Sequence, residues 1–236
     1  MQRLRIRYAK RGRLRFSSHR DFSRAFERAV FRARIPMAYS SGFNPHPRIS
    51  YAGAAPTGSS SEAEYLEIGL SEVIDPARAH AEIDEALPEG LDVIEVVASA
   101  GGSMTDRLEA SWWKITLQEP PAGDLRQAAD ALLASDEVIV ERMTKKGVRR
   151  FDARAAIVSA TVSDPLPDRP ACAILDVVLR HGSPSVRPDD VLAALREISG
   201  LGVTAAVQQR LAQGPLDLES GTVGDPLTPD RDAAGQ

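Results

Sequence analysis

Two periodicities meet in the first 34 residues and decide the fold of this part of the chain. RLRIRY at residues 3–8 alternates arginine with apolar side chains, and this period of two is typical of a strand with one buried face. FSRAFERAVFRAR at residues 22–34 repeats apolar side chains every third or fourth residue, as one face of a helix does. Pro36 ends this helix. The chain therefore begins with a strand and an amphipathic helix that can pack on it.

The remaining strand and helix signals occur in a repeating order. Residues 1–100 are expected to form strand, helix, strand, strand, helix and strand, and the same order returns at 108–212. This order predicts an α+β fold of two tandem ferredoxin-like (β-α-β-β-α-β) units. After the first helix, the expected elements are strands at 48–52, 64–70 and 91–98 with a helix at 76–86, then strands at 111–117, 138–143, within 148–162, 171–180 and 203–211 with helices at 123–134 and 188–199.

Two further features concern the second half of the chain. Residues 213–236 are rich in Gly, Pro and Asp, a composition that predicts a disordered acidic tail. Trp112 and Trp113 open the second unit, and neighbouring positions on a strand face opposite ways. One indole is therefore expected in the core and the other partly exposed or at a domain interface.

Charge is distributed very unevenly along the chain. The first fifty residues hold 13 Lys and Arg but only the acids Asp21 and Glu27, an excess of +11. The whole chain has 29 basic and 33 acidic residues, so residues 51–236 hold 16 basic and 31 acidic ones and sum to −15. A basic segment in an acidic protein predicts a polyanionic partner, and a nucleic-acid backbone is the commonest polyanion.

Composition also excludes several classes of protein. The single cysteine, Cys172, excludes an internal disulfide, a Cys-rich zinc site and an iron–sulfur cluster held by this chain alone. No apolar run approaches the roughly 18–20 residues of a membrane span. The start MQRLRIR lacks the apolar core of a secretion signal, so a cytoplasmic location is expected. No complete catalytic or metal-binding signature is present, and no metal site is predicted.

Arginines of the first helix are the first candidates for phosphate binding. Arg20, Arg24, Arg28 and Arg32 recur every fourth residue. Four residues advance a helix by about 6 Å, which is close to the spacing of phosphates along a strand. The alternative is a solvated helix face without a ligand.

Further basic residues extend this candidate surface. Arg5 and Arg7, with Arg3, lie on the strand face away from its apolar side chains, where an open sheet could read a nucleic-acid backbone. Aromatic side chains for base stacking are absent from that strand face. The other candidates are Arg48 and a cluster at Lys145, Lys146, Arg149 and Arg150. That cluster could equally be an exposed basic hairpin.

Two histidines are candidates for acid–base chemistry. Ser17, Ser18 and His19 precede or begin the first helix, where free N–H groups and the helix dipole form an anion site. The alternative is that Ser17 or Ser18 simply caps the helix. His46 lies between two prolines in GFNPHPR at residues 42–48, so its loop is rigid. If close together, His19 and His46 would resemble the pairs that cleave RNA without metal. Structural roles for both histidines are the alternative.

Several motifs together resemble one known family. FSSHRD at 16–21, FERA at 26–29, IPMAYS at 35–40, GFNPHPRIS at 42–50 and the later EYL at 64–66 and KG…RFDAR at 146–154 carry the resemblance. They resemble a domain of unknown function found beside, or fused to the C-terminus of, a radical SAM protein. Arg20 departs from that pattern, which has an apolar residue after the histidine. The resemblance implies a partner enzyme that holds S-adenosylmethionine and the iron–sulfur cluster, with no cofactor in this chain.

Together these observations predict a cytoplasmic, non-catalytic RNA-binding accessory protein. It would present RNA of the tRNA or rRNA class to a separate radical SAM enzyme. One alternative is a metal-independent endoribonuclease that uses His19 and His46. The other is a protein-docking module that binds an acidic partner without RNA.

Overall fold

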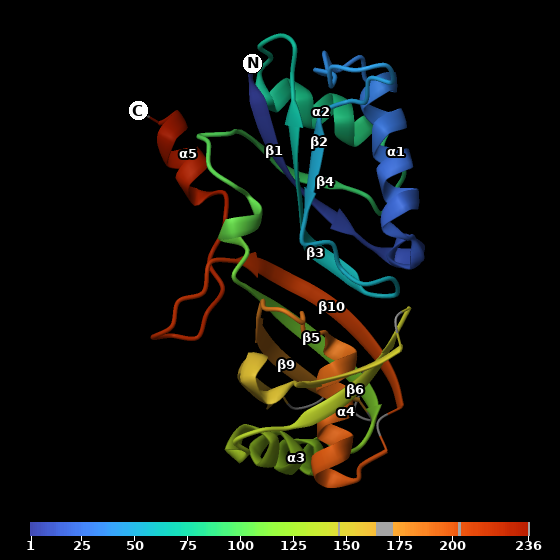
Figure 1. The fold of residues 1–236 in the computed structure, drawn as a ribbon, viewed down its shortest axis with the longest axis vertical. Helices are drawn as coiled ribbons and strands as arrows, with labels where there is room; N and C mark the ends of the chain where they lie inside the picture. Colours follow the sequence, from blue (N-terminus) through green and yellow to red (C-terminus); the bar gives the residue numbers. More distant parts are fainter. Residues whose placement is uncertain (146, 164–171, 203, 236) are drawn as a thin grey trace. The chain divides into compact units, whose positions relative to one another are not determined.

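Strands and helices alternate within two units of the chain, as Figure 1 shows. The computed structural model describes residues 1–145, 147–163, 172–202 and 204–235. One unit is Met1–Leu108 together with Asp225–Gln236, and the other is Glu109–Gly224. The fold is mixed α+β, with five α-helices in the described residues and mostly antiparallel strands. Within the same residues, no helix combines the length and the apolar character that a membrane crossing requires.

The first unit contains a four-stranded antiparallel sheet with two long helices. Its strands lie in the order β4-β1-β3-β2. Its element order, β-α-β-β-α-β, is the one predicted from the sequence. The elements are β1 (Arg3–Lys10), η1 (Gly12–Phe16), α1 (His19–Arg32), β2 (Ile49–Ala52), β3 (Ser60–Gly69), α2 (Pro76–Ala86), β4 (Val93–Ala98) and η2 (Thr105–Arg107).

The two periodicities of the N-terminal segment form the core of this unit. Leu4 and Ile6 of β1 are fully buried, and the Tyr8 ring stacks on Phe22 of α1 with centroids 4.4 Å apart. Phe26 continues the buried side of α1. The predicted strand and the predicted amphipathic helix therefore pack on each other through the side chains that defined their periods.

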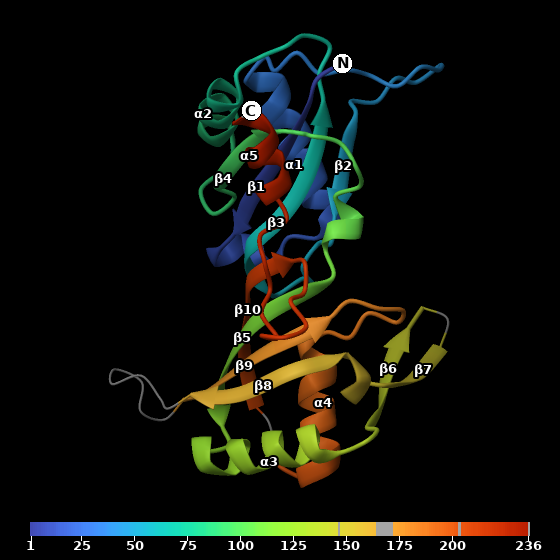
Figure 2. The ribbon, with the colours of Figure 1, turned by 90° about the vertical axis from the view of Figure 1, so that its left-hand side faces the viewer.

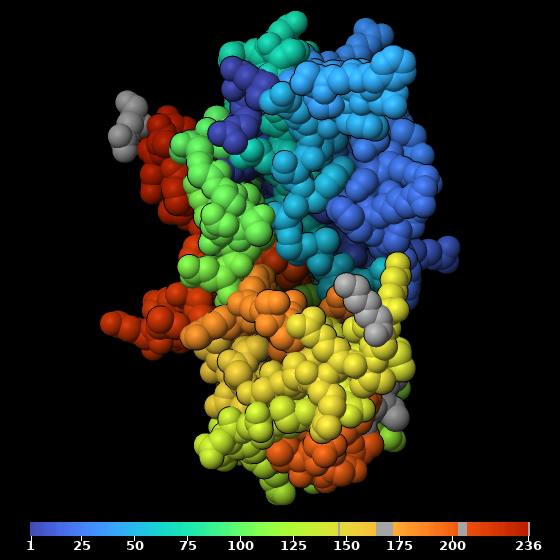
Figure 3. Space-filling model, viewed as in Figure 1, coloured from blue at the N-terminus to red at the C-terminus, as the bar shows by residue number. Residues whose placement is uncertain are grey.

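The C-terminal segment closes the other face of this sheet. Helix α5 (Thr228–Ala234) lies against β1 and β4 in Figures 1 and 2, and Figure 3 shows it (red) packed against the segment after β4 (green). Leu227 is fully buried, and Asp230 accepts from both Arg5 and Arg107. The prediction of a disordered tail at 213–236 was wrong, because Leu227 packs in an apolar cluster of the first unit and Asp230 binds two distant arginines.

The second unit has the same element order with an added hairpin. Its main antiparallel sheet has the order β10-β5-β9-β8, and β6 and β7 form a separate two-stranded sheet. Trp113 is buried and Trp112 is 40% exposed, so the expected division of the two indoles is confirmed. The elements are β5 (Ala110–Glu119), α3 (Ala122–Ala134), β6 (Ile139–Thr144), β7 (Gly147–Asp152), η3 (Arg154–Ala156), β8 (Ile157–Ser163), β9 (Ala173–Arg180), α4 (Pro188–Ser199) and β10 (Thr204–Gly214).

Candidate nucleic-acid interface

The outer side of α1 carries a row of exposed arginines. Phe22 and Phe26 turn the opposite side of the helix into the core. Among the described residues, none of the four guanidinium groups in the row forms a salt bridge with a carboxylate. Because the row is exposed and forms no salt bridge among the described residues, its charge is available to a ligand. The row consists of Arg20, Arg24, Arg28 and Arg32.

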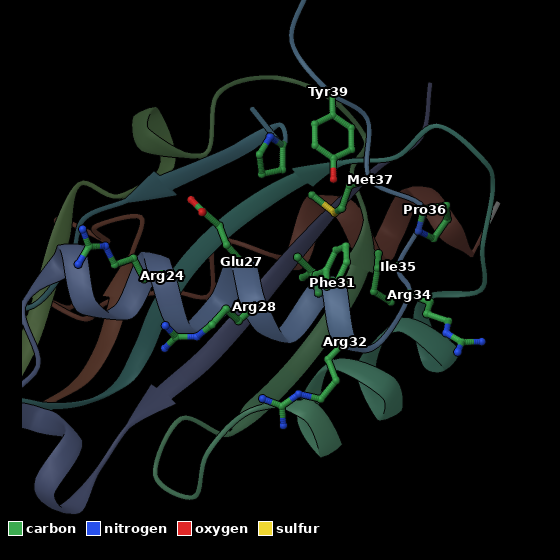
Figure 4. A pocket seen from close by; sticks show the side chains of 12 residues that line it. Arg24, Glu27, Arg28, Phe31, Arg32, Arg34, Ile35, Pro36, Met37 and Tyr39 are labelled. Carbon is green, nitrogen blue, oxygen red and sulfur yellow. The ribbon is translucent and has the colours of Figure 1, made fainter. Parts of the chain in front are cut away.

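A groove of about 1100 Å³ lies at the C-terminal half of α1. Figure 4 shows Arg24, Arg28 and Arg32 along one side of the helix, with Glu27 on the side toward the segment that carries Tyr39. Cations therefore border one side of this hollow. The groove is lined by Arg24, Glu27, Arg28, Val30, Phe31, Arg32, Arg34, Ile35, Pro36, Met37, Tyr39 and Pro47.

Exposed aromatic side chains accompany these arginines. Phe31 of α1 is 80% exposed and Tyr39 is 52% exposed, and both line the groove. Phe43, in the loop that follows, is fully exposed. The first strand has no aromatic side chains on its arginine face, and the exposed rings lie instead on α1 and in the segment after it. The missed signal was Phe31, an aromatic residue one position outside the buried stripe of α1.

The arginines of β1 are used differently, and the prediction that Arg5 binds nucleic acid was wrong. Arg5 is fully buried, and its Nη1 donates to both carboxylate oxygens of Asp230 at 2.8 Å. Its Nε donates to Glu67 at 3.0 Å, and its Nη2 donates to the carbonyls of Gly101 and Gly102. All of its donor directions are thus used inside the protein, so no phosphate can reach it.

Arg7 and Arg48 also make internal contacts. Arg7 is half-buried, and its Nε donates to the carbonyl of Glu62 at 2.9 Å. Arg48 is exposed, and its Nε donates to the carbonyl of Tyr39 at 3.3 Å. Because Tyr39 lines the groove, Arg48 lies beside it and keeps an exposed guanidinium there.

The expected anion site at the start of α1 is already filled by the protein. Ser18 caps the helix through the Asp21 N–H, and the Asp21 carboxylate accepts from the Ser18 N–H and hydroxyl. These hydrogen bonds, with nearby Arg24 and Arg20, lower the pKa of Asp21. Ser17 donates to the Leu14 carbonyl at 2.6 Å. An external anion at Ser17, Ser18 and His19 would have to displace a bound carboxylate.

His19 and His46 lie at opposite ends of α1. His19 begins the helix, and its ring meets the edge of Tyr51 on β2 with centroids 4.9 Å apart. His46 lies in the loop after the helix, where its carbonyl accepts from the Ser40 N–H. A helix of 14 residues is about 21 Å long. The structure therefore does not bring these two imidazoles together as an acid–base pair.

The second basic cluster lies on the β6–β7 hairpin. Lys145 and Arg149 are exposed, and Arg150, also exposed, forms a salt bridge with Glu141 at 3.3 Å. Lys146, predicted to contact nucleic acid, lies outside the described residues. Arg142 attaches the hairpin to α4 through Asp190 at 2.9 Å. The hairpin thus exposes at least two cations, Lys145 and Arg149, and the contact between Arg142 and Asp190 holds it on α4.

Comparison with known proteins identifies a family and a distant likeness. No curated protein matches the sequence. Among solved structures, the chain is similar to one in the crystal structure of a Cbf5-Nop10-Gar1 complex, with 8% identity and a TM-score of 0.45. The match covers 89% of this chain and 48% of the other, so this chain spans about half its length. Over residues 3–188 the sequence matches a family model, and the chain therefore belongs to the family described as "Uncharacterized protein conserved in bacteria (DUF2344)".

Proposed function

We propose that this protein binds a single strand of RNA along the outer side of α1. The observation that carries the proposal is the row of unpaired arginines bordering a groove of about 1100 Å³ that contains exposed aromatic rings. Guanidinium groups bind phosphates in a forked geometry, and aromatic rings stack on unpaired bases. The two kinds of contact occur side by side here. This combination favours a flexible strand over a rigid duplex, in which the bases are stacked inside.

The spacing of the arginines supports a backbone path along the helix. Arg24, Arg28 and Arg32 are separated by one step of about 6 Å each, so successive phosphates can meet successive guanidinium groups. Phe31 and Tyr39 lie in the same groove, where an unpaired base can stack. Arg48, beside Tyr39, provides a further phosphate contact in this proposal. Lys145 and Arg149, on the hairpin of the second unit, are separate candidates for phosphate contacts.

The wider role proposed here is that of an accessory protein. It presents RNA of the tRNA or rRNA class to a separate radical SAM enzyme, which holds S-adenosylmethionine and the iron–sulfur cluster. This link rests on the sequence resemblance and on the single cysteine of the chain. The proposed fold assignment is two ferredoxin-like units in tandem. It is supported by the shared strand order, β4-β1-β3-β2 in one unit and β10-β5-β9-β8 in the other.

The alternatives make different predictions. A metal-independent nuclease that uses His19 and His46 together would need them close, and α1 separates them. A docking surface for an acidic protein would use the same arginines without RNA. Only RNA binding requires Phe31 and Tyr39 to contribute through base stacking.

Binding of purified, nuclease-treated protein to a labelled 20-nucleotide unstructured RNA, measured in EDTA across a salt series, tests the proposal. We expect affinity that falls steeply with salt and RNA that is recovered intact. Combined substitution of Arg24→Gln, Arg28→Gln and Arg32→Gln should weaken binding. The matched control, Arg126→Gln, Arg180→Gln and Arg196→Gln, removes the same charge from exposed positions of the second unit.

Three other outcomes would contradict the proposal or favour one of its alternatives. Discrete RNA fragments would support the nuclease, provided that His19→Ala or His46→Ala abolishes them. Equal weakening of RNA binding by both triple variants would show that the loss depends on the net charge of the protein and not on the α1 arginines. Absence of binding at low salt would exclude RNA and leave protein docking.

A further inference from the structure

The second unit has a pocket on the sheet face that its helices leave open. Helices α3 and α4 lie on one face of the sheet in Figure 2, and the chain after β10 lies on the other. Trp112 and Lys114 of β5 point to this second face, since Trp113 and Ile115 between and beyond them are buried in the core. Successive side chains of β5 therefore point alternately into the core and into the pocket.

Strand register places the pocket side chains in two adjacent rows. Lys114 pairs with Asp176, which pairs with Thr161. In the next row Trp112 pairs with Val178, which pairs with Ser159. One indole, one ammonium, one carboxylate and two hydroxyl groups therefore converge on a single surface.

A short loop forms the second wall of the pocket. Leu216 and Val223 bridge its two arms, and the Asp217 N–H donates to the Thr222 carbonyl at 3.0 Å. Gly221 has a φ of +68°, a conformation that favours glycine at this turn. Between this loop and the sheet lies a cavity of about 500 Å³, within the usual range of about 300–1,000 Å³ for small-molecule sites. The pocket is lined by Trp112, Lys114, Ser159, Thr161, Asp176, Val178 and Ser220–Val223.

The indole is fixed in place and still accessible. Trp112 Nε1 donates to Asp176 Oδ1 at 3.2 Å, and the residue is 40% exposed. Asp176 Oδ2 also accepts from the Ser163 hydroxyl at 3.4 Å. A carboxylate offers about four acceptor positions, so Asp176 retains capacity for a ligand.

The geometry points to a binding site for one unpaired nucleobase of RNA, stacked on Trp112. The base edge would donate an N–H to Asp176 and accept from Lys114, which lies directly opposite on the neighbouring strand. The Ser159 and Thr161 hydroxyl groups meet the remaining polar atoms of the nucleoside. This inference rests on the proposed function and extends it from phosphate contacts in one unit to base contacts in the other.

Tryptophan fluorescence of the full chain, titrated with an unstructured 12-nucleotide RNA of U and A, tests the inference. We expect quenching in the wild type. Trp112→Ala should weaken binding on the order of tenfold, because that is the cost of losing one stacked base, and should leave the salt dependence unchanged. Trp112→Phe retains a stacking ring, so it should retain most of the affinity while abolishing the quenching.

The outcomes separate this inference from the proposed function. If Trp112→Ala and Trp112→Phe bind like the wild type and quench as it does, the pocket is not a base site, even if the α1 arginine variants weaken binding. If the wild type does not bind the 12-mer, the proposed function has failed, and adenosine, which has no phosphate, becomes the probe. Quenching by adenosine that Trp112→Phe abolishes would then uphold the pocket, and its absence would overturn it.

Discussion

The arginines of β1 and those of α1 lie within thirty residues of each other in the sequence and have opposite environments. Arg5 is fully buried and bonded to two carboxylates and two carbonyls. Arg24 and Arg28 are exposed, without a salt bridge among the described residues. The difference shows that a basic segment can hold buried, paired cations beside exposed cations whose charge is available to a ligand. The two kinds of arginine differ in whether carboxylates lie close enough to pair with them.

Those counter-charges come from far along the chain. Asp230, which accepts from Arg5 and Arg107, is 225 residues from Arg5. Burial alone would raise the pKa of Asp230, but hydrogen bonds from the Ala100 N–H and the two guanidinium groups outweigh it and hold the pKa below its usual range. The carboxylate is therefore ionised at neutral pH and compensates the buried charge of Arg5.

The largest expected effect comes from breaking the buried pair. Arg5→Met leaves Asp230 buried with one fewer cation, and we expect a loss of about 3–5 kcal/mol in the free energy of unfolding. Urea denaturation measures this loss. The matched control Arg3→Met removes an exposed partner of Glu67 and should cost less than about 1 kcal/mol. Equal, small effects from both changes would contradict a structural role for Arg5.

Acid should release the same contact. Because the pKa of Asp230 is lower in the folded protein than in the unfolded chain, its stabilising contribution is complete above the unfolded pKa of about 3.9. It is lost as the pH falls through the folded pKa. Urea denaturation between pH 6 and 3 should show this loss in the wild type and a shallower one in Asp230→Asn, which is less stable at neutral pH. Identical pH profiles for the two proteins would contradict this account.

A smaller effect is expected from the aromatic rings beside the α1 arginines. Phe31→Ala or Tyr39→Ala should weaken RNA binding on the order of tenfold each, with no change in salt dependence, because stacking does not displace counterions. Fluorescence anisotropy with labelled RNA measures both quantities. Phe16→Ala is the control, since Phe16 is also exposed but lies outside the groove. A loss of equal size in the control would rule out a specific stacking site.

The smallest effect concerns the start of α1. Ser18→Ala removes the helix cap and should cost about 1 kcal/mol of stability, while RNA affinity stays unchanged. Urea denaturation and anisotropy check the two halves of this prediction. Ser41→Ala, at an exposed loop position, should change neither quantity. A drop in affinity with Ser18→Ala would show that the capping serine also binds the ligand.

Local patterns predicted the elements of the fold well. The periods at residues 3–8 and 22–34 identified β1, α1 and the side chains that join them, because strand and helix periods depend only on neighbours. The role of residues 225–235 could not be predicted. Their composition matches a disordered tail, and the contacts that order them, from Asp230 and Leu227, are long-range.

The candidate site was only partly predictable for the same reason. The arginine row of α1 followed from its spacing, but the burial of Arg5 depends on a helix distant in sequence. The capping box at Ser18 is, by contrast, a local contact between residues three positions apart. A serine cap at Ser17 or Ser18 was expected and Ser18 forms it, but Asp21, three residues away, supplies from within the protein the carboxylate at the site where an external anion was predicted.

The most direct test removes the same charge from the two sets of arginines and compares the salt dependence of RNA binding. One variant carries Arg24→Gln and Arg28→Gln, and the other carries Arg3→Gln and Arg7→Gln. For single strands, log affinity falls with log salt with a slope of about −0.7 per phosphate contact, so the slope of the α1 variant should be shallower than that of the wild type by about 1.4. The β1 variant should keep the wild-type slope. Equal losses in both variants would contradict the division between structural and ligand-binding arginines.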